Sequence, residues 1–221
     1  MSHKTHPKIL RIAETKDWLS RGFYEKSFAK YLEEDFKIRK FLKDKLPKGI
    51  TDSIEIERER VSLKIIIKTS RPALIIGRGG EGVEKLKGQI KEFIWGGKGE
   101  EDIEEKPKNN IKIEILAVKN VWASASLDAQ WIVFQIEKRM PYRRVLKMAL
   151  DKIMVVREIK GARVEVAGRL NGVSIHRTEW LQKGELPRQR IKAIIDYGFA
   201  EAHCTYGLIG VKVWLYKGEN D

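Results

Sequence analysis

The 221-residue chain has little cysteine, no long apolar run and few side chains that bind metals. Its single cysteine, Cys204, excludes an internal disulfide and favours a reducing, cytoplasmic compartment. The four histidines do not have zinc-site spacing with that one thiol, so we expect no metal. No apolar stretch approaches the roughly 20 residues of a membrane-spanning helix, and the N-terminus lacks the hydrophobic segment of a secretory signal. We therefore expect no membrane partner.

Acidic residues are also in the minority. Lysine and arginine number 44 against 31 aspartates and glutamates, which gives a net charge of +13, while apolar residues at 42% suffice for packed cores. Such an excess of positive charge favours polyanionic partners, with nucleic acid ahead of an anionic membrane surface. The alternative is a basic protein whose charge has no such role.

The first part of the chain predicts a basic arm followed by a small α+β domain. Residues 1–26 carry scattered bases with little periodicity, which is typical of an arm that becomes ordered on a polyanion. Residues 27–118 predict a domain in the order helix, strand, strand, short helix, glycine loop, helix, strand. Its expected elements are a helix over 27–46 with an apolar face of Phe28, Leu32, Phe36, Phe41 and Leu42, strands over 54–56 and 61–68, a short helix over 72–76, a helix over 83–94 and a strand over 111–117. The acidic segment 96–110 is expected to be a solvated insertion.

The remaining residues, 119–221, predict a second domain without repeats of the first. Pro141 separates two helices, over 126–136 with Ser126 as its cap and over 142–155. Alternating patterns then predict strands over 163–166, 174–178, 200–204 and 209–215. Two helices on a mostly antiparallel sheet form an α+β layer.

The stretch RPALIIGRGGEGVEKL, residues 71–86, admits two functional interpretations of its glycines. Gly77, Gly79 and Gly82 have the dinucleotide spacing G-x-G-x-x-G, which requires a preceding strand and an acid roughly 20 residues later. Neither is evident, and no G-K-S or G-K-T follows for a phosphate loop. Gly77 and Gly80 also fit G-x-x-G, a loop between two helices that clamps single-stranded nucleic acid.

The G-x-x-G interpretation makes Gly77, Arg78, Gly79 and Gly80 a nucleic-acid site. Bare backbone at this corner lets amides approach a phosphodiester chain, Arg78 adds a charge, and Ile75 with Ile76 is expected to floor a groove for bases. The element order over residues 27–118 matches the type 2 K-homology topology. The structural alternative is a glycine corner that serves helix packing alone.

Several long segments resemble one family. The stretch RPALIIGRGGEGVEKL, the opening HPKILRI and the segments PYRRVLKMAL, VAGRLNGVSIHRTEW and IDYGFAEAHCTYGLIGVKVWLYKGE are similar to bacterial small-subunit ribosomal protein S-three. The resemblance covers essentially the whole chain. It implies a non-enzymatic structural component of the small-subunit head, with a type 2 K-homology domain and a second α+β domain.

The resemblance also implies partners and sites. The expected partners are 16S-type rRNA, mRNA, and the ribosomal proteins numbered ten and fourteen in the head and four and five where mRNA enters. Arg143, Arg144 and Lys147 would line the channel through which mRNA enters and assist its unwinding. The expected rRNA contacts are Lys4, Lys8, Arg11, Arg163, Arg169, Arg177, Arg188, Arg190 and Lys192. Arginine suits this task because its planar fork grips phosphate oxygens.

The resemblance implies no catalytic residue, no cofactor and no small-molecule substrate. One alternative stays open, a free-standing K-homology regulator that binds single-stranded RNA or DNA.

Overall fold

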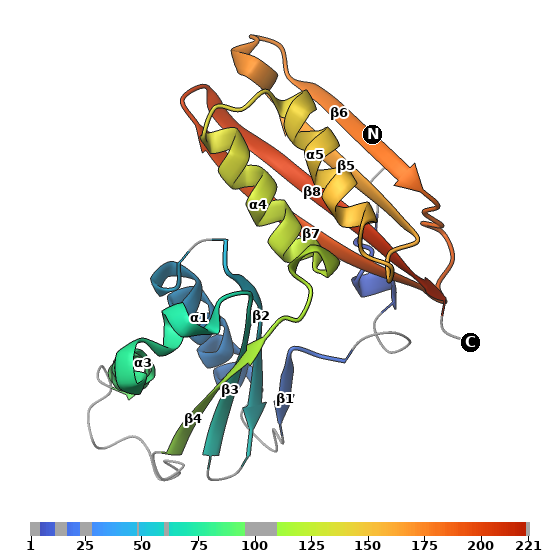
Figure 1. Ribbon diagram of the computed structural model, residues 1–221. Helices are drawn as coiled ribbons and strands as arrows, with labels where there is room; N and C mark the ends of the chain where they lie inside the picture. Colours follow the sequence, from blue (N-terminus) through green and yellow to red (C-terminus); the bar gives the residue numbers. More distant parts are fainter. Residues whose placement is uncertain are drawn as a thin grey trace. The chain divides into compact units, whose positions relative to one another are not determined.

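The computed structural model describes residues 5–11, 17–22, 28–47, 49–59, 62–95 and 110–219. These divide into two compact units, one over residues 18–119 and one that joins residues 1–17 to residues 120–221 (Figure 1). The described N-terminal residues 5–11 thus belong with the C-terminal unit, whereas the sequence analysis places residues 1–26 in an arm of their own. The physical reason is a set of contacts made by Arg11, described below.

The unit over residues 18–119 is a mixed four-stranded sheet with helices on one face (Figure 1). Its strands are β1 (Ser20–Gly22), β2 (Thr51–Arg58), β3 (Ser62–Thr69) and β4 (Asn110–Ala117), and its helices are α1 (Phe28–Lys45), α2 (Pro72–Ile76) and α3 (Glu81–Trp95). Strands β2 and β3 are antiparallel, while β1 and β4 join the two edges in parallel. The order α1-β2-β3-α2-α3-β4 confirms the predicted K-homology topology; β1 is an addition that the sequence did not reveal.

The apolar face predicted for α1 is wrong in its first half. Ile38 and Leu42 are fully buried against the sheet, but Phe36 is 67% exposed, and Phe28 and Leu32 are also exposed. The residue of this half of α1 that faces the sheet is Asp35, next to Phe36. Asp35 is buried and accepts hydrogen bonds from Ser20 Oγ at 2.8 Å and Arg58 Nε at 2.8 Å. A buried carboxylate with two donors therefore occupies the place that periodicity gives to a phenylalanine.

The C-terminal unit is a four-stranded antiparallel sheet covered on one face by two helices (Figure 1). Its elements are η3 (Val121–Ala123), α4 (Ala125–Glu137), α5 (Tyr142–Met154), β5 (Gly161–Gly168), η4 (Leu170–Gly172), β6 (Arg177–Gly184), β7 (Ala193–Cys204) and β8 (Gly207–Glu219), in the strand order β6-β5-β8-β7. The predicted α+β layer is confirmed. The strand predicted over 174–178 is misplaced, because β6 begins only at Arg177.

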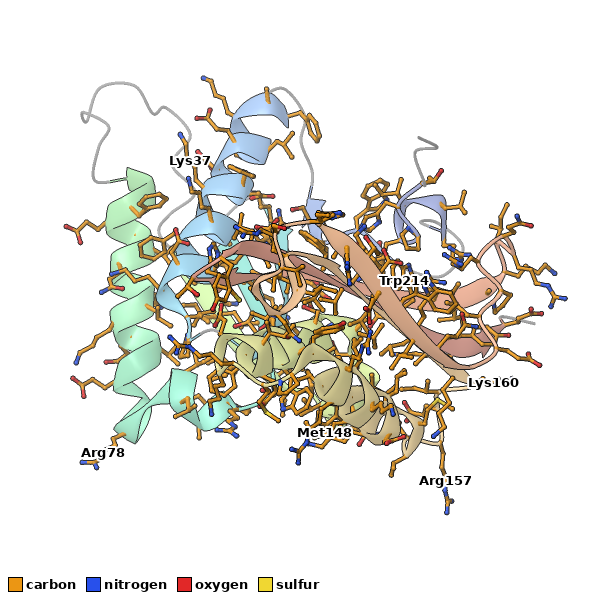
Figure 2. The ribbon with its side chains drawn as sticks, turned by 90° about the horizontal axis from the view of Figure 1, so that it is seen from above. Lys37, Arg78, Met148, Arg157, Lys160 and Trp214 are labelled. Atoms are coloured by element: carbon orange, nitrogen blue, oxygen red, sulfur yellow. The ribbon has the colours of Figure 1, made fainter. Side chains whose placement is uncertain are left out.

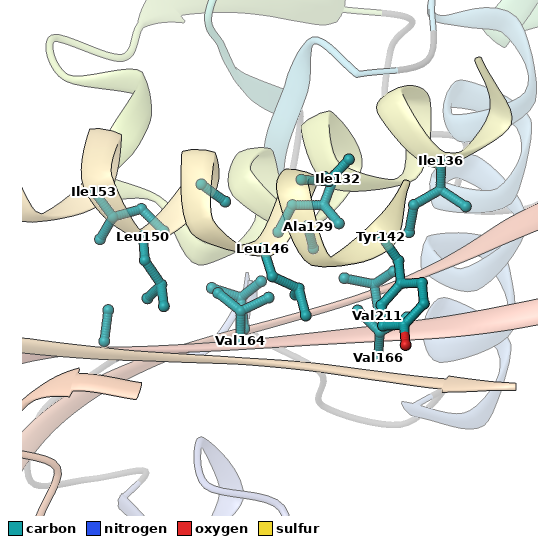
Figure 3. Packing of buried hydrophobic residues seen from close by; sticks show 14 of the residues in the cluster. Ala129, Ile132, Ile136, Tyr142, Leu146, Leu150, Ile153, Val164, Val166 and Val211 are labelled. Carbon is teal, nitrogen blue, oxygen red and sulfur yellow. The ribbon is translucent and has the colours of Figure 1, made fainter. Parts of the chain in front are cut away.

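The core of this unit lies between the helices and the sheet (Figure 3). Leu146 of α5 points toward Val164 of the sheet, and Ile132, Ile153 and Val211 belong to the same buried cluster. Because inward residues of α5 recur at helical spacing, its opposite face, with Arg144 and Lys147, stays in solvent. The core thus fixes the direction in which these cations point.

The other face of the sheet carries aromatic side chains and the N-terminal segment. Trp214, Tyr216 and Ile195 are buried there, and the His6 ring meets the edge of Tyr197 with centroids 4.8 Å apart. The short helix η1 (Ile9–Arg11) ends this segment.

Candidate nucleic-acid interface

The corner between α2 and α3 has the backbone that the G-x-x-G interpretation requires. Gly77 closes α2 by donating its N–H to Ala73 O at 3.0 Å, and the turn η2 (Arg78–Gly80) leads into α3. Gly77 and Gly80 adopt φ of +71° and +85°, in the left-handed region that favours glycine. Arg78 is exposed at the tip and projects away from the ribbon (Figure 2). The structure therefore presents a cationic, glycine-rich corner to solvent.

The third glycine of the dinucleotide spacing has a packing role. A Cβ at Gly82 would lie 2.4 Å from Ile75 O and 2.8 Å from Ile76 O, so glycine is needed for α3 to pack against α2. The segment before the corner is the helix α2 and not a strand, which removes the context of a dinucleotide site. The G-x-G-x-x-G match is explained by two backbone conformations and one close helix contact.

This packing role predicts opposite effects for two glycines of α3. Gly82→Ala should lower the free energy of unfolding of this unit by about 1–3 kcal/mol, because its methyl group collides with backbone carbonyls. Gly88→Ala, where no atom lies within 4 Å of the added Cβ, should raise it by up to about 1 kcal/mol through helix propensity. Urea denaturation of the two variants checks this, and equal effects would contradict the close contact.

The predicted floor of the groove beside this corner needs correction. Ile75 is buried in the core of the unit, so it cannot contact a base. Ile76 is partly exposed and Leu74, which the sequence analysis passed over, is 58% exposed. The apolar surface next to the glycines therefore comes from Leu74 and Ile76.

The three cations predicted on α5 differ in their surroundings. Arg143 is held by Glu179, with Nε 3.2 Å from Oε2 and Nη2 3.1 Å from Oε1. Tyr142 Oη donates to Glu179 Oε1 at 2.7 Å. These hydrogen bonds raise the pKa of Arg143 and lower the pKa of the Glu179 carboxyl, so this pair stays charged at neutral pH. Arg144 and Lys147 are exposed and make no ion pair with the rest of the described chain.

A pocket of about 300 Å³ opens beside Arg143. It is lined by Tyr142 and Arg143 at the start of α5, by Leu170 and Asn171 of η4, and by Val173 and Arg177. Arg143 and Arg177, which the sequence analysis assigns to different RNAs, are thus brought to one place. The sequence did not identify Glu179 as the partner of Arg143. Because Glu179 lies two residues after Arg177 in β6, the side chains of Glu179 and Arg177 lie on the same face of the sheet.

Arg169 shapes the loop that borders this pocket. Its Nε donates to Val173 O at 3.1 Å and its Nη1 donates to Tyr206 O at 3.2 Å. Within the loop, Asn171 has φ of +55°. The guanidinium of Arg169 is exposed but already makes two hydrogen bonds, so its first role is to fix the loop.

Two arginines predicted to contact rRNA are buried. Arg11 is 1% exposed and donates to the carbonyl oxygens of Pro7, Arg188 and Arg190 at 2.8–3.0 Å. Arg163 is also buried, lies 4.0 Å from the Trp180 ring centroid and pairs with Glu165 at 2.9 Å. Both guanidinium groups make their contacts within the protein, so Arg11 and Arg163 are not part of the exposed basic surface.

The remaining predicted rRNA contacts are exposed or partly engaged. Arg188 and Lys192 are exposed, while Arg190 pairs with Glu219 at 2.6 Å. Lys8 lies 3.2 Å from Asp196, and Lys4 lies outside the described residues. Because Arg11 holds the carbonyls of Arg188 and Arg190, it positions this basic segment without offering its own charge.

The described residues include neither a candidate membrane span nor a candidate metal site. No helix there has both the length and the apolar character required to cross a membrane. In the same part of the chain, no cluster of His, Cys, Asp and Glu could hold a metal ion.

Comparison with known proteins places both units in one family. A KH domain model matches residues 37–123, and a model described as ribosomal protein S3, C-terminal domain, matches residues 132–215. Small ribosomal subunit protein uS3 of Caldicellulosiruptor saccharolyticus is 44% identical over 220 residues, which are 99% of this chain and 93% of that protein. The uS3 proteins of Caldicellulosiruptor bescii (43% identical, 99% of this chain and 93% of that one) and Solibacter usitatus (42%, 99% and 60%) are also similar. The chain therefore belongs to the uS3 family of small ribosomal subunit proteins.

Proposed function

We propose that this protein binds 16S-type rRNA in the head of the small ribosomal subunit and that Arg143, Arg144 and Lys147 face mRNA where it enters. As a uS3 family member it is a ribosomal protein and not an enzyme. The observation that carries the RNA proposal is the solvent face of α5, where Arg144 and Lys147 stand exposed without an ion pair in the described chain. Neighbours on such a helix direct their charges into one volume of solvent.

The G-x-x-G corner supports a second RNA contact in the K-homology unit. Its glycine backbone is exposed, Arg78 stands at its tip, and Leu74 with Ile76 adds apolar surface beside it. These are the features by which such loops hold single strands. Of the predicted rRNA contacts, Lys8, Arg169, Arg177, Arg188, Arg190 and Lys192 remain in the proposal. We also propose the ribosomal proteins numbered ten and fourteen, and four and five, as neighbours.

Sedimentation tests the ribosomal proposal against a free regulator. A tagged copy of the chain in a bacterial lysate should migrate with small subunits on a sucrose gradient at low salt. Recovery only in the soluble fractions at the top would overturn the proposal and favour the free K-homology regulator.

Salt dependence tests the nature of the RNA contact. With purified protein and a small-subunit rRNA fragment, affinity should fall roughly tenfold or more between about 50 and about 200 mM salt, because at least three phosphate contacts release counterions. A complex indifferent to salt would contradict phosphate recognition, and no complex at low salt would remove RNA binding altogether.

A further inference from the structure

The pocket beside Arg143 combines an apolar interior with a cationic rim. Leu170 and Tyr142 form its buried base, and Val173, which is 38% exposed, gives most of the apolar surface that a ligand could reach. Arg143 and Arg177 line it with exposed side chains from α5 and β6. Asn171 adds an amide, which both donates and accepts hydrogen bonds. Its volume of about 300 Å³ is at the small end of the range for small-ligand sites, about 300–1,000 Å³.

The pocket is built before any ligand arrives. Glu179 fixes Arg143 and Tyr142 on one side through hydrogen bonds of 2.7–3.2 Å. Arg169 ties the loop on the other side to Tyr206, whose ring would lie 3.1 Å from a Cβ at Gly172. A site whose walls are held by other contacts loses little entropy on binding.

These features match the parts of one nucleotide. A base has flat apolar faces and a polar edge, which suit the exposed Val173 side chain above the buried Tyr142 and Leu170, and the Asn171 amide. The phosphate of the nucleotide carries a negative charge that Arg177 attracts, together with Arg143, whose own charge is partly offset by its ion pair with Glu179. A stacked helical segment would not fit so small a space, so the base must leave its stack to enter.

We propose that this pocket takes a single unstacked nucleotide of an RNA strand, so that Arg143 and Arg177 grip the same strand. The proposal rests on the proposed function and deepens it, since it names the RNA feature that the α5 surface recognises. Arg144 and Lys147 would hold phosphates along the strand, while the pocket holds one base.

Filling the pocket without changing its charge tests the proposal. Val173→Phe places a ring in the pocket, and Ile175→Phe adds the same bulk on the same loop outside the lining, where Ile175 is 68% exposed. The probes are a uridine decamer RNA and an abasic ribose-phosphate decamer with equal numbers of phosphates. Fluorescence anisotropy at low salt and at higher salt gives the affinity of each of the three proteins for each of the two decamers.

The wild type and Ile175→Phe should prefer the uridine decamer over the abasic one, and Val173→Phe should reduce that preference about fivefold or more, which is the contribution of one stacked base. The salt dependence should be the same for all three proteins, because no phosphate contact is lost. Asn171→Gly is a second variant that keeps the positive φ, removes the amide and should also reduce the preference. Thermal unfolding of each variant verifies that it folds.

Three outcomes bear on the inference and on the function on which it rests. If the wild type binds the decamers but Val173→Phe and Asn171→Gly leave the preference for uridine unchanged, the pocket does not take a base and the inference is overturned. If the wild type binds neither decamer nor rRNA at low salt, the RNA function itself fails. A pocket that binds free uridine monophosphate, with no effect of Val173→Phe on either decamer, would also overturn the inference.

Discussion

Replacing Arg144 and Lys147 together by glutamine is expected to weaken binding of single-stranded RNA roughly 25-fold at about 0.1 M salt. Each cation that neutralises a phosphate contributes about 0.7 to the slope of log affinity against log salt. Two lost contacts therefore flatten that slope by about 1.4 and remove about fivefold each at that salt concentration. Neither side chain has an ion pair in the described chain, so their removal should leave the fold intact.

The control for this prediction changes charge in the same way at another place. Lys37 and Lys40 are exposed on α1 at the same i, i+3 spacing, and Lys37 projects outward with Glu33 as its partner (Figure 2). The Lys37→Gln, Lys40→Gln protein has the same net charge as the Arg144→Gln, Lys147→Gln protein. Titrations against one oligonucleotide at several salt concentrations compare them. Equal losses would mean that net charge, and not the α5 face, drives binding.

Local patterns were enough to predict the order of the helices and strands of both units, apart from the short strand β1. Alternation in β3 and β8 and helical spacing in α5 follow from burial of one face, which a sequence records directly. The G-x-x-G corner was also predictable, because the positive φ of Gly77 and Gly80 favours glycine whatever surrounds it. In each case a few neighbouring residues contain the whole physical cause.

Burial of charge could not be predicted in the same way. Arg11 resembles other bases of the N-terminal segment, yet its acceptors belong to Arg188 and Arg190, far along the chain. Arg163 is likewise buried because Trp180 and Glu165 surround it on the helix-free face of the sheet. Composition counts such arginines as surface charge, although their charge is used inside the protein. The candidate pocket was hidden for the same reason, since α5 and η4 meet only in the fold.

The apolar side chains of α1 show the converse limit. Phe28, Leu32 and Phe36 have helical spacing, but the buried position is Asp35, which forms ion pairs with Arg58. Helical spacing identifies a stripe but does not show which neighbour covers it. When a charged residue such as Asp35 has buried partners, it can occupy the inward position of the helix, so that the adjacent apolar residue, here Phe36, faces solvent.

A single methyl group on Gly198 is expected to destabilise the C-terminal unit by about 3 kcal/mol or more, at the upper end of the cost of overpacking. Gly198 of β7 lies against the start of α4, and a Cβ there would sit 2.0 Å from Ala125 O and 2.7 Å from Ser126 N. Relief requires α4 to move off the sheet. That movement would strain the hydrogen bond from Ala125 N to Asp196 Oδ2 at 3.1 Å. It would also disturb the N-cap of α4, which is Ser124 and not the predicted Ser126; the Ser124 hydroxyl accepts a hydrogen bond from Leu127 N.

Gly210 of β8 gives the matched comparison in the same sheet. A Cβ there would make an ordinary contact of 3.5 Å with the Phe199 ring, so Gly210→Ala should change stability by less than about 1 kcal/mol. Thermal unfolding should then show the transition of the C-terminal unit lowered by about 12 °C or more for Gly198→Ala and nearly unchanged for Gly210→Ala, given about 4 °C per kcal/mol for a unit of this size. Similar transitions for the two variants would mean that α4 does not rest on β7 at Gly198. Because α4 and α5 share the core that directs Arg144 and Lys147 outward, Gly198→Ala should also weaken RNA binding, but only near its own unfolding temperature.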